Sequence, residues 1–353
     1  MKSKNNLIFF CLEYNQDSIL LSHTYYWVNE LATHFSSTTV VCVRANISLK
    51  SPEINVIEIG GGSLRKRITA LYELIKVTIS VIKKHKQTSI FHHMWTQPLA
   101  LFGWVFKIAK IPQILWYSHS AKNMTLRIGI KFCDFIVTPN LDCFPILNPS
   151  KVIEVGHGIQ TRRFQHFSTK SKRRNDIVVL GRISQIKHIH ELVAAVSKLR
   201  LTSGDNLEID LIGPILDENY CEYLKDLSSK SGVVLRFKPP VSAREVPQIL
   251  SKYNYSFNGN PKTLDKSAVE AALAGCLLIS EVKPVLYLTG MQEVWKTLEG
   301  RIPKLEEQIT IMSQLTENQK VKMRAILFQR ASLNNDLKVT MQRIAKLFQE
   351  LQK

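Results

Sequence analysis

No apolar stretch of this chain is long enough to cross a bilayer. The longest, Pro98–Phe106, is far shorter than the roughly 18 residues that a transmembrane helix needs. Leu7–Leu12 is apolar, but Glu13 follows it at once, so this stretch is too short for a secretory signal. We therefore expect a cytoplasmic protein that is either soluble or attached peripherally to the inner face of a membrane.

Paired cysteines are also missing. The cysteines form no CxxC pattern and no cysteine–histidine spacing suited to a zinc site. Several lie inside apolar runs, which is typical of buried thiols in a reducing compartment. We predict buried, reduced thiols at all six positions, namely Cys11, Cys42, Cys133, Cys143, Cys221 and Cys276.

Acidic residues are few. Asp and Glu number 29 against 47 Lys and Arg, which leaves a net charge of +18. Such a surplus attracts nucleic acid, anionic lipid headgroups or phosphorylated ligands, and charge alone does not select among them. The chain has no Asp-x-Asp sequence and no aromatic–basic pattern of the common nucleic-acid-binding modules. We therefore expect no catalytic metal ion, no other cofactor and no nucleic-acid partner.

The chain does contain a regular alternation of short apolar runs and helical segments. The predicted strands are 7–12, 39–45, 54–59, 89–93, 113–119, 134–139, 151–156, 176–181, 207–213, 233–238, 255–260 and 276–280. The predicted helices are 17–35, 63–86, 97–110, 121–132, 188–199, 217–230, 243–252, 265–274 and most of the chain beyond 284. This alternation indicates an α/β protein with parallel sheets covered on both faces.

The length and one basic segment predict two domains. Single cores stop growing at about 250–300 residues, and this chain has 353. The segment 161–174 is polar and strongly basic, without an apolar period, which is typical of a linker. We predict doubly wound, Rossmann-like domains over 1–162 and 175–335, joined by a basic linker over 163–174. Ligands bind beyond the carboxyl ends of such strands, so we expect the site in a cleft between the domains.

The strongest local signal follows the predicted strand 176–181. Gly181 permits a tight turn, and Arg182 and Lys187 project from the loop that leads into the next helix. An arginine fork beside a lysine point charge suits a diphosphate. A solvated surface loop is equally compatible with this spacing alone.

A second signal lies at 258–275, where a strand leads through a Gly- and Pro-containing loop into a helix. Asp265 is a predicted N-cap, and a helix N-terminus favours phosphate through its free amides and its dipole. Glu270, one turn further, is placed to accept hydrogen bonds from ribose hydroxyls, although an exposed acid is the commoner fate of Glu. The residues expected to supply free amides or positive charge here are Lys262, Lys266, Ser267 and Ala268.

Together the two segments resemble the C-terminal domain of retaining, family-four glycosyltransferases of the GT-B fold (glycosyl transferases group 1). The matching residues are Gly181, Arg182, Lys187, Glu270, Ala271, Ala274 and Gly275. The resemblance implies that Arg182 and Lys187 hold the diphosphate of a nucleotide-sugar donor and that Glu270 holds its ribose. Lys262 replaces the first acid of the family's pair, which affects the expected contact to the donor sugar. The dipeptide 265–266 is similar to a variant of bacterial members that act on surface polysaccharides.

The N-terminal half resembles the same family in two places. His119 ends a predicted strand where a family histidine lies against the donor sugar and phosphate, so the resemblance assigns it a catalytic role. The loop Gly156–Ile159 is similar to the family's crossing between domains, with Gln160 in place of the usual acid. His92 and His93 are neighbours on one predicted strand, so we expect one of the two to face the cleft.

Two predicted helices bear on the packing of the domains and on contact with a membrane. The final predicted helix, Leu337–Leu351, has an apolar face, and the resemblance implies that 336–353 crosses back onto the N-terminal domain. The predicted helix 63–86 carries arginines and lysines among apolar residues. Two interpretations stay open: a surface held at an anionic bilayer near a lipid-linked acceptor, or the solvated basic face of a core helix.

The resemblance implies a retaining glycosyltransferase that needs no metal and transfers a sugar from a nucleotide-diphosphate sugar to a lipid-linked or polysaccharide acceptor. Other classes stay open. A GT-B nucleotide-sugar epimerase would need an acid–base pair over the sugar, and the sequence shows none. Lys262 and Gln160 are compatible with a catalytically degenerate protein that binds carbohydrate or a partner. A nucleic-acid-binding protein would account for the positive charge.

Overall fold

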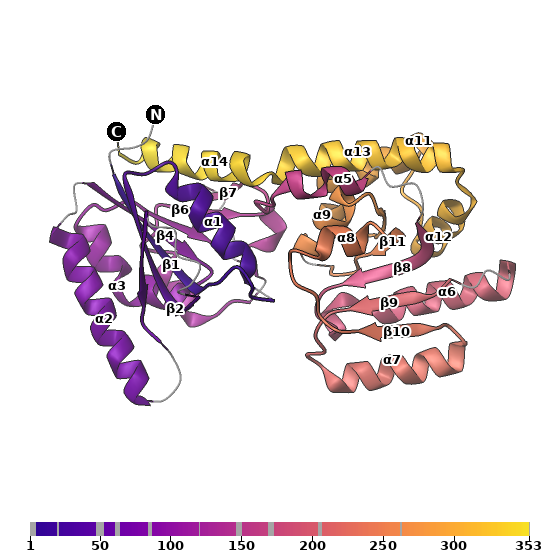
Figure 1. The fold of residues 1–353 in the computed structure, drawn as a ribbon, viewed down its shortest axis with the longest axis horizontal. Coiled ribbons are helices and arrows are strands. Elements are labelled where there is room, and N and C mark those ends of the chain that lie inside the picture. Colours follow the sequence, from indigo (N-terminus) through magenta and orange to yellow (C-terminus); the bar gives the residue numbers. More distant parts are fainter. Residues whose placement is uncertain are drawn as a thin grey trace. The chain divides into compact units, whose positions relative to one another are not determined.

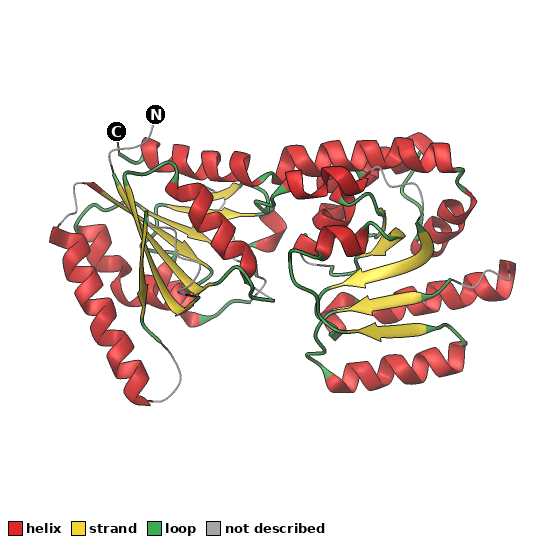
Figure 2. Cartoon of the chain, in the orientation of Figure 1, coloured by secondary structure: helices red, strands yellow, loops and turns green. Residues whose placement is uncertain are grey.

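The computed structural model describes residues 5–19, 21–46, 53–60, 64–83, 87–119, 121–145, 150–168, 173–203, 207–261 and 263–352. The chain divides into two compact units, and each contains a parallel sheet with helices packed against it (Figures 1 and 2). The first unit comprises Met1–Gly158 together with Leu337–Lys353. The second unit comprises Ile159–Asp336.

The first unit contains a seven-stranded parallel sheet of order β3-β2-β1-β4-β5-β6-β7. Its strands are β1 (Asn6–Tyr14), β2 (Ser37–Ala45), β3 (Ile54–Glu58), β4 (Thr88–His93), β5 (Gln113–Trp116), β6 (Phe135–Thr138) and β7 (Val152–Glu154). Its helices are α1 (Ser22–Ala32), α2 (Leu64–Lys83), α3 (Thr96–Ile108), α4 (Met124–Gly129), η3 (Leu141–Cys143) and α14 (Leu337–Glu350).

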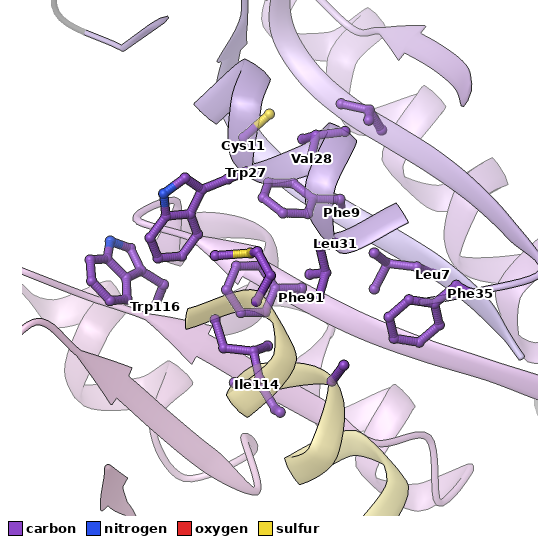
Figure 3. Packing of buried hydrophobic residues seen from close by; sticks show 14 of the residues in the cluster. Leu7, Phe9, Cys11, Trp27, Val28, Leu31, Phe35, Phe91, Ile114 and Trp116 are labelled. Atoms are coloured by element: carbon purple, nitrogen blue, oxygen red, sulfur yellow. The ribbon is translucent and has the colours of Figure 1, made fainter. Parts of the chain in front are cut away.

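Successive side chains of a strand point to opposite sides of the sheet, and in the central strands β4 and β5 every residue is buried. Phe9 and Phe91 pack with α1 and α14 on one face of the sheet. Phe10 and Ile90 pack with α2 and α3 on the other face. Figure 3 shows the cluster that contains Phe9 and Phe91, with Trp27 of α1 among its labelled residues. The sheet therefore has a helical layer on each side, as the apolar strands predicted.

Helix α14 completes the core of the first unit, which confirms the expectation for the last helix. The Phe348 ring lies 5.7 Å from that of Phe35 and 6.5 Å from that of Phe91, measured between ring centroids. Thr340 Oγ1 donates a hydrogen bond to the carbonyl oxygen of Val155 at 3.0 Å. The residues of α14 that join this core are Leu337, Met341, Ile344, Ala345 and Phe348.

The second unit contains a five-stranded parallel sheet of order β10-β9-β8-β11-β12. Its strands are β8 (Arg174–Leu180), β9 (Ile209–Ile212), β10 (Leu235–Lys238), β11 (Tyr253–Phe257) and β12 (Leu277–Ile279). Its helices are η4 (Thr161–Phe164), α5 (Gln165–Ser168), η5 (Gln185–Lys187), α6 (Ile189–Ser203), α7 (Glu218–Ser231), α8 (Val246–Leu250), α9 (Lys266–Leu273), α10 (Lys283–Thr289), α11 (Met291–Glu299), α12 (Leu305–Gln314) and α13 (Glu317–Asn335).

The boundary between the two units lies ahead of the predicted linker 163–174. Phe164 is buried, and Arg163 Nη2 donates to the carbonyl oxygen of Ala243 at 2.7 Å. Arg174 is already the first residue of β8. The described part of this basic segment is therefore anchored to the second unit, because one buried aromatic side chain and one guanidinium hold it there.

The predicted helices and strands are present, with differences at their ends. The helix predicted over 17–35 begins only at Ser22, and the strand predicted over 113–119 ends at Trp116, so His119 lies in the following loop. All six cysteines are buried and free, as predicted. Within the described ranges, no helix combines the length and the apolar character needed to cross a membrane.

Candidate functional site

The turn from β8 into α6 depends on two glycines. Gly181 has a φ of +126° and Gly213, after β9, has a φ of +150°, conformations that L residues rarely adopt. A Cβ at Gly213 would overlap the carbonyl oxygen of Gly181. A Cβ at Gly181 would lie 3.8 Å from Nζ of Lys187 and 3.9 Å from Oγ of Ser267. The end of β8 therefore lies beside both Lys187 and the start of α9.

Lys187 ends η5, and its side chain points back into this turn. Only 8% of the residue is exposed. Its Nζ lies 2.5 Å from Oδ2 of Asp265, the residue before α9. Within the described part of the chain, the Lys187 side chain forms no other hydrogen bond or ion pair. Since an ammonium group has three N–H donors, two remain for an anionic ligand.

Asp265 occupies the N-cap position of α9, as predicted, but its side chain makes no capping hydrogen bond. Its carboxylate accepts instead from Nδ2 of Asn258 at 2.8 Å and from Nδ2 of Asn260 at 3.1 Å, beside Lys187. Burial opposes ionisation, but the charge of Lys187 and these amide donors outweigh it, so the pKa of Asp265 lies below its ordinary value. A carboxylate that stays charged holds the ammonium group of Lys187 in place.

The loop after β11 packs directly on the η5 turn. A Cβ at Gly259 would lie 2.7 Å from the carbonyl oxygen of Lys187, so only glycine fits at this approach. Asn258 Oδ1 is buried and has no hydrogen-bond partner in the described ranges. Neither Asn258 nor Asn260 was among the site residues predicted from the sequence. The two signals at 181–187 and 258–275 therefore form one site, with an unpaired acceptor beside its ion pair.

The N-terminus of α9 differs from the prediction at one amide. The backbone N–H of Ala268 donates to the carbonyl oxygen of Asp265 at 3.0 Å, and Ala268 is buried. The prediction of a free amide at Ala268 is therefore wrong, because the tight first turn of the helix already satisfies it. Lys266 and Ser267 have no backbone acceptor for their amides in the part of the chain that the structure describes.

Glu270 is buried, with 7% of the residue exposed, so the alternative of an exposed helix acid is wrong. Its Oε1 lies 3.0 Å from Nζ of Lys266, one turn earlier on α9. Lys266, like Lys187, therefore has an acidic partner. Lys262 lies outside the described residues.

Arg182 is exposed and makes no hydrogen bond or ion pair within the described ranges. The charges of Lys187 and Lys266 are each balanced by a carboxylate. Arg182 therefore gives the cluster its net positive charge. A diphosphate placed here would meet a guanidinium fork, two remaining lysine donors and two helix amides, which is a suitable set for its oxygens.

The predicted catalytic histidine, His119, belongs to the first unit. It is exposed in the loop after β5, and its Nδ1 accepts the backbone N–H of Ala121 at 2.9 Å. A neutral ring with an accepting Nδ1 carries its proton on Nε2. The other predicted residues, from Gly181 to Glu270, belong to the second unit.

His92 and His93 are both buried at the end of β4, and the expectation that one of them faces a cleft is wrong. The ring of His92 stacks on Phe10 at 5.1 Å, and the ring of His93 lies 5.4 Å from that of Trp27. Burial lowers the pKa of each histidine to about 3, so both are neutral at physiological pH. They act as aromatic side chains of the core.

The loop at Gly156–Ile159 is fixed by a tryptophan of α1. Trp27 Nε1 donates to the carbonyl oxygen of Gly158 at 3.0 Å. Gly158 has a φ of +61°, and a Cβ there would lie 2.7 Å from the indole ring. This anchored glycine is the last residue of the first unit before the chain enters the second.

Neither a protein-family model nor a curated protein matches this sequence. Solved structures do match it over nearly the whole chain. With its two parallel, Rossmann-like sheets and a C-terminal helix that packs on the first, the chain has the GT-B fold.

Three glycosyltransferase structures illustrate the similarity. HepE of Anabaena in complex with UDP-glucose has a TM-score of 0.71 at 14% identity, over 98% of this chain and 99% of its own. A glycosyltransferase of Rickettsia africae has a TM-score of 0.71 at 13% identity, over 99% of both chains. An α,α-trehalose-phosphate synthase (UDP-forming) of Burkholderia xenovorans has a TM-score of 0.69 at 8% identity, over 98% of this chain and 100% of its own.

Proposed function

We propose that this chain is a glycosyltransferase that transfers a sugar from a nucleotide-diphosphate sugar to an acceptor. The observation that carries the proposal is the site of Arg182, Lys187 and the α9 amides beyond the carboxyl ends of β8 and β11, within the GT-B fold. HepE was solved with UDP-glucose, and the Burkholderia synthase is described as UDP-forming. A uridine diphosphate sugar is therefore the first donor to test.

In this proposal the chain supplies fixed positive charge where negative charge develops. Arg182 and Lys187 contact the diphosphate and stabilise it as it departs from the sugar. Asp265 keeps the ammonium of Lys187 aimed at this position. The amides of Lys266 and Ser267 bind the same group, so the reaction needs no metal ion.

The remaining predicted residues are assigned to the ribose and the sugar of the donor. When the donor binds, Lys266 also contacts the phosphate, and the carboxylate of Glu270 then accepts hydrogen bonds from the ribose hydroxyls. His119 is proposed as a catalytic residue on the family resemblance alone. Retention of anomeric configuration is proposed from the family resemblance of 181–187 and 270–275. The proposed acceptor is a lipid-linked or polysaccharide intermediate.

Thermal unfolding with UDP-, GDP-, ADP- and dTDP-sugars tests the donor site. A bound donor is expected to stabilise the protein by about 2.7 kcal/mol at a hundredfold excess over its dissociation constant. The shift should occur with one nucleotide class and disappear in an Arg182→Ala/Lys187→Ala variant. It should persist in Arg127→Ala, which removes an exposed arginine of α4 in the first unit.

Three results would contradict this proposal. If no sugar nucleotide shifts the midpoint of the well-folded protein, the donor site is absent. If a donor binds but its nucleotide is never released, with or without glycan and lipid acceptors, the chain is a catalytically degenerate binder. Interconversion of two sugar nucleotides without release would establish the epimerase instead.

We also propose that the face of α2, α3 and α4 that points away from the sheet holds the enzyme at an anionic bilayer. These helices expose many large apolar side chains. Soluble proteins rarely expose so many together on one face. Their acids are Glu73 and, just after α4, Asp134, and each is paired with a lysine. The exposed apolar residues are Ile68, Leu71, Tyr72, Ile75, Ile79, Leu101, Trp104, Ile108, Met124 and Ile128. The exposed bases are Lys76, Lys83, Lys107, Lys110, Lys122, Arg127 and Lys131.

Vesicle sedimentation tests this surface. We expect binding to phosphatidylglycerol-containing vesicles that weakens with salt, and little binding to phosphatidylcholine alone. Trp104→Ser/Ile108→Ser should reduce the partition coefficient at least about tenfold, since burial of one such side chain contributes about 1.5–3 kcal/mol. The control Leu201→Ser/Tyr287→Ser removes exposed apolar side chains of the second unit. Equal binding of both double variants would rule this surface out.

A further inference from the structure

Three potential metal ligands converge at the start of α6. His188, His190 and Glu191 place one ligand atom each within 4.8 Å of one another. The Nδ1 of His188 lies 2.8 Å from Oε1 of Glu191. The rings of His188 and His190 stack with their centroids 5.5 Å apart and their planes at 30°. The side chains of His188 and Glu191 are 34% and 49% exposed, so an ion can reach them from solvent.

A backbone conformation explains why these two histidines meet. Residues two apart on a regular helix point to different sides. His188 precedes α6 and has a φ of +50°, in the left-handed region that residues other than glycine seldom adopt. This conformation turns its ring back over His190. The turn η5, which ends with Lys187, therefore brings the rings of His188 and His190 together.

Tyr220 orients the second histidine. Its hydroxyl oxygen lies 3.0 Å from Nδ1 of His190 and accepts the backbone N–H of the same residue at 3.2 Å. With Nδ1 held in this way, Nε2 is the ring atom left for a ligand. Metal-binding histidines are commonly fixed by such a hydrogen bond from the other ring nitrogen.

We propose that His188, His190 and Glu191 bind a divalent first-row transition metal, with Zn²⁺ as the probe. Two imidazoles and a carboxylate are ligands that zinc uses, and a fourth position would be left for water. The metal would take the place of the hydrogen bond between His188 and Glu191. The positive end of the α6 dipole opposes a cation here, and the carboxylate of Glu191 offsets it. None of these three ligands is assigned to the proposed donor site, so the metal site does not rest on the proposed sugar transfer.

Titration of the full chain with Zn²⁺, in competition with a chromophoric chelator, tests the site. We expect one ion per chain, with affinity at least about 10–100-fold weaker in His190→Gln and in His188→Asn, since losing a ligand costs no less than losing the hydrogen-bonding partner of a ligand. Asparagine tolerates the left-handed conformation at position 188, so the turn is kept. The control His166→Gln changes an exposed histidine of the same unit outside the cluster and should bind as the wild type does.

Spectroscopy with Co²⁺ gives a second readout. The expected spectrum is that of nitrogen and oxygen ligation, without a thiolate charge-transfer band, because all six cysteines are buried. Zinc binding that is unchanged in both histidine variants, a thiolate band, or no stoichiometric binding would each overturn the proposal. Without metal, all variants should still unfold cooperatively, which separates lost ligation from lost folding.

Discussion

Replacing Lys187 by alanine is expected to reduce sugar transfer about 10²–10³-fold, the usual effect of removing one preorganised group that stabilises developing charge. The same substitution should destabilise the protein by about 1–3 kcal/mol, because it leaves the carboxylate of Asp265 without its charged partner. That carboxylate keeps its two amide donors and is 15% exposed, so the protein should still fold. Steady-state kinetics and urea unfolding measure the two effects.

At acidic pH, the difference in unfolding free energy between Lys187→Ala and the wild type should disappear. The pKa of Asp265 is lowered in the folded protein, so its contribution is fully present above the unfolded value and is lost as the pH falls through the folded value. The deficit of Lys187→Ala relative to the wild type should therefore shrink below about pH 4, where an unfolded aspartate becomes protonated. A deficit that stays constant into acid would mean that Asp265 is not the cause.

Two further variants separate catalysis from folding. Arg182→Ala should lose transfer to a similar extent while its unfolding curve stays unchanged, because Arg182 has no described partner to leave behind. Lys187→Ala/Asp265→Asn should recover part of the stability and none of the activity. Transfer that returns in the double variant would show that Lys187 acts only through the structure, contrary to the proposal.

Replacing Gly213 by alanine is expected to destabilise the second unit by about 3–5 kcal/mol, the sum of backbone strain and overpacking. The new Cβ would overlap the carbonyl oxygen of Gly181, and neither backbone can move without shifting β8 or β9. Donor binding should be lost with it, since Gly181 leads into the turn that positions Lys187. Chemical denaturation and calorimetry measure the change.

Gly300→Ala is the matched control for this prediction. Gly300 also has a positive φ, of +68°, but a Cβ there would meet no atom within 4 Å. It should therefore show only the strain of the left-handed conformation, about 1–2 kcal/mol. Equal losses in the two variants would mean that strain alone matters and that the close approach of the two strands does not.

The elements around the site could be predicted because their signals are local. Gly181, Arg182 and Lys187 stand between a continuous apolar strand and an amphipathic helix, and this order places them at a carboxyl edge. The pairing of Lys187 with Asp265 could not be predicted, since the two are far apart in sequence and nothing in either segment specifies the other. The hydrogen bond of Ala268 depends on how tightly the first turn of α9 closes.

Burial was harder to predict than secondary structure. Helix α2 is apolar on more than one side, and its sequence does not say which side meets the sheet. The structure buries Leu74 and Val77, while Leu71 and Ile75 are exposed. Glu270 shows the opposite case, because a helix acid next to a lysine is usually exposed and this one is buried.

Helix α14 has a consequence for the order in which the protein can be made. During synthesis β1 and β4 leave the ribosome early, yet Phe348, which packs on Phe91, is added only after the whole second unit. The second unit is continuous in sequence and can close as soon as Asp336 has emerged. Until α14 itself has been made, the part of the sheet face that it covers stays exposed, although α1 already packs on the same face. Nascent chains stalled before Leu337 should accordingly be the species that chaperones bind.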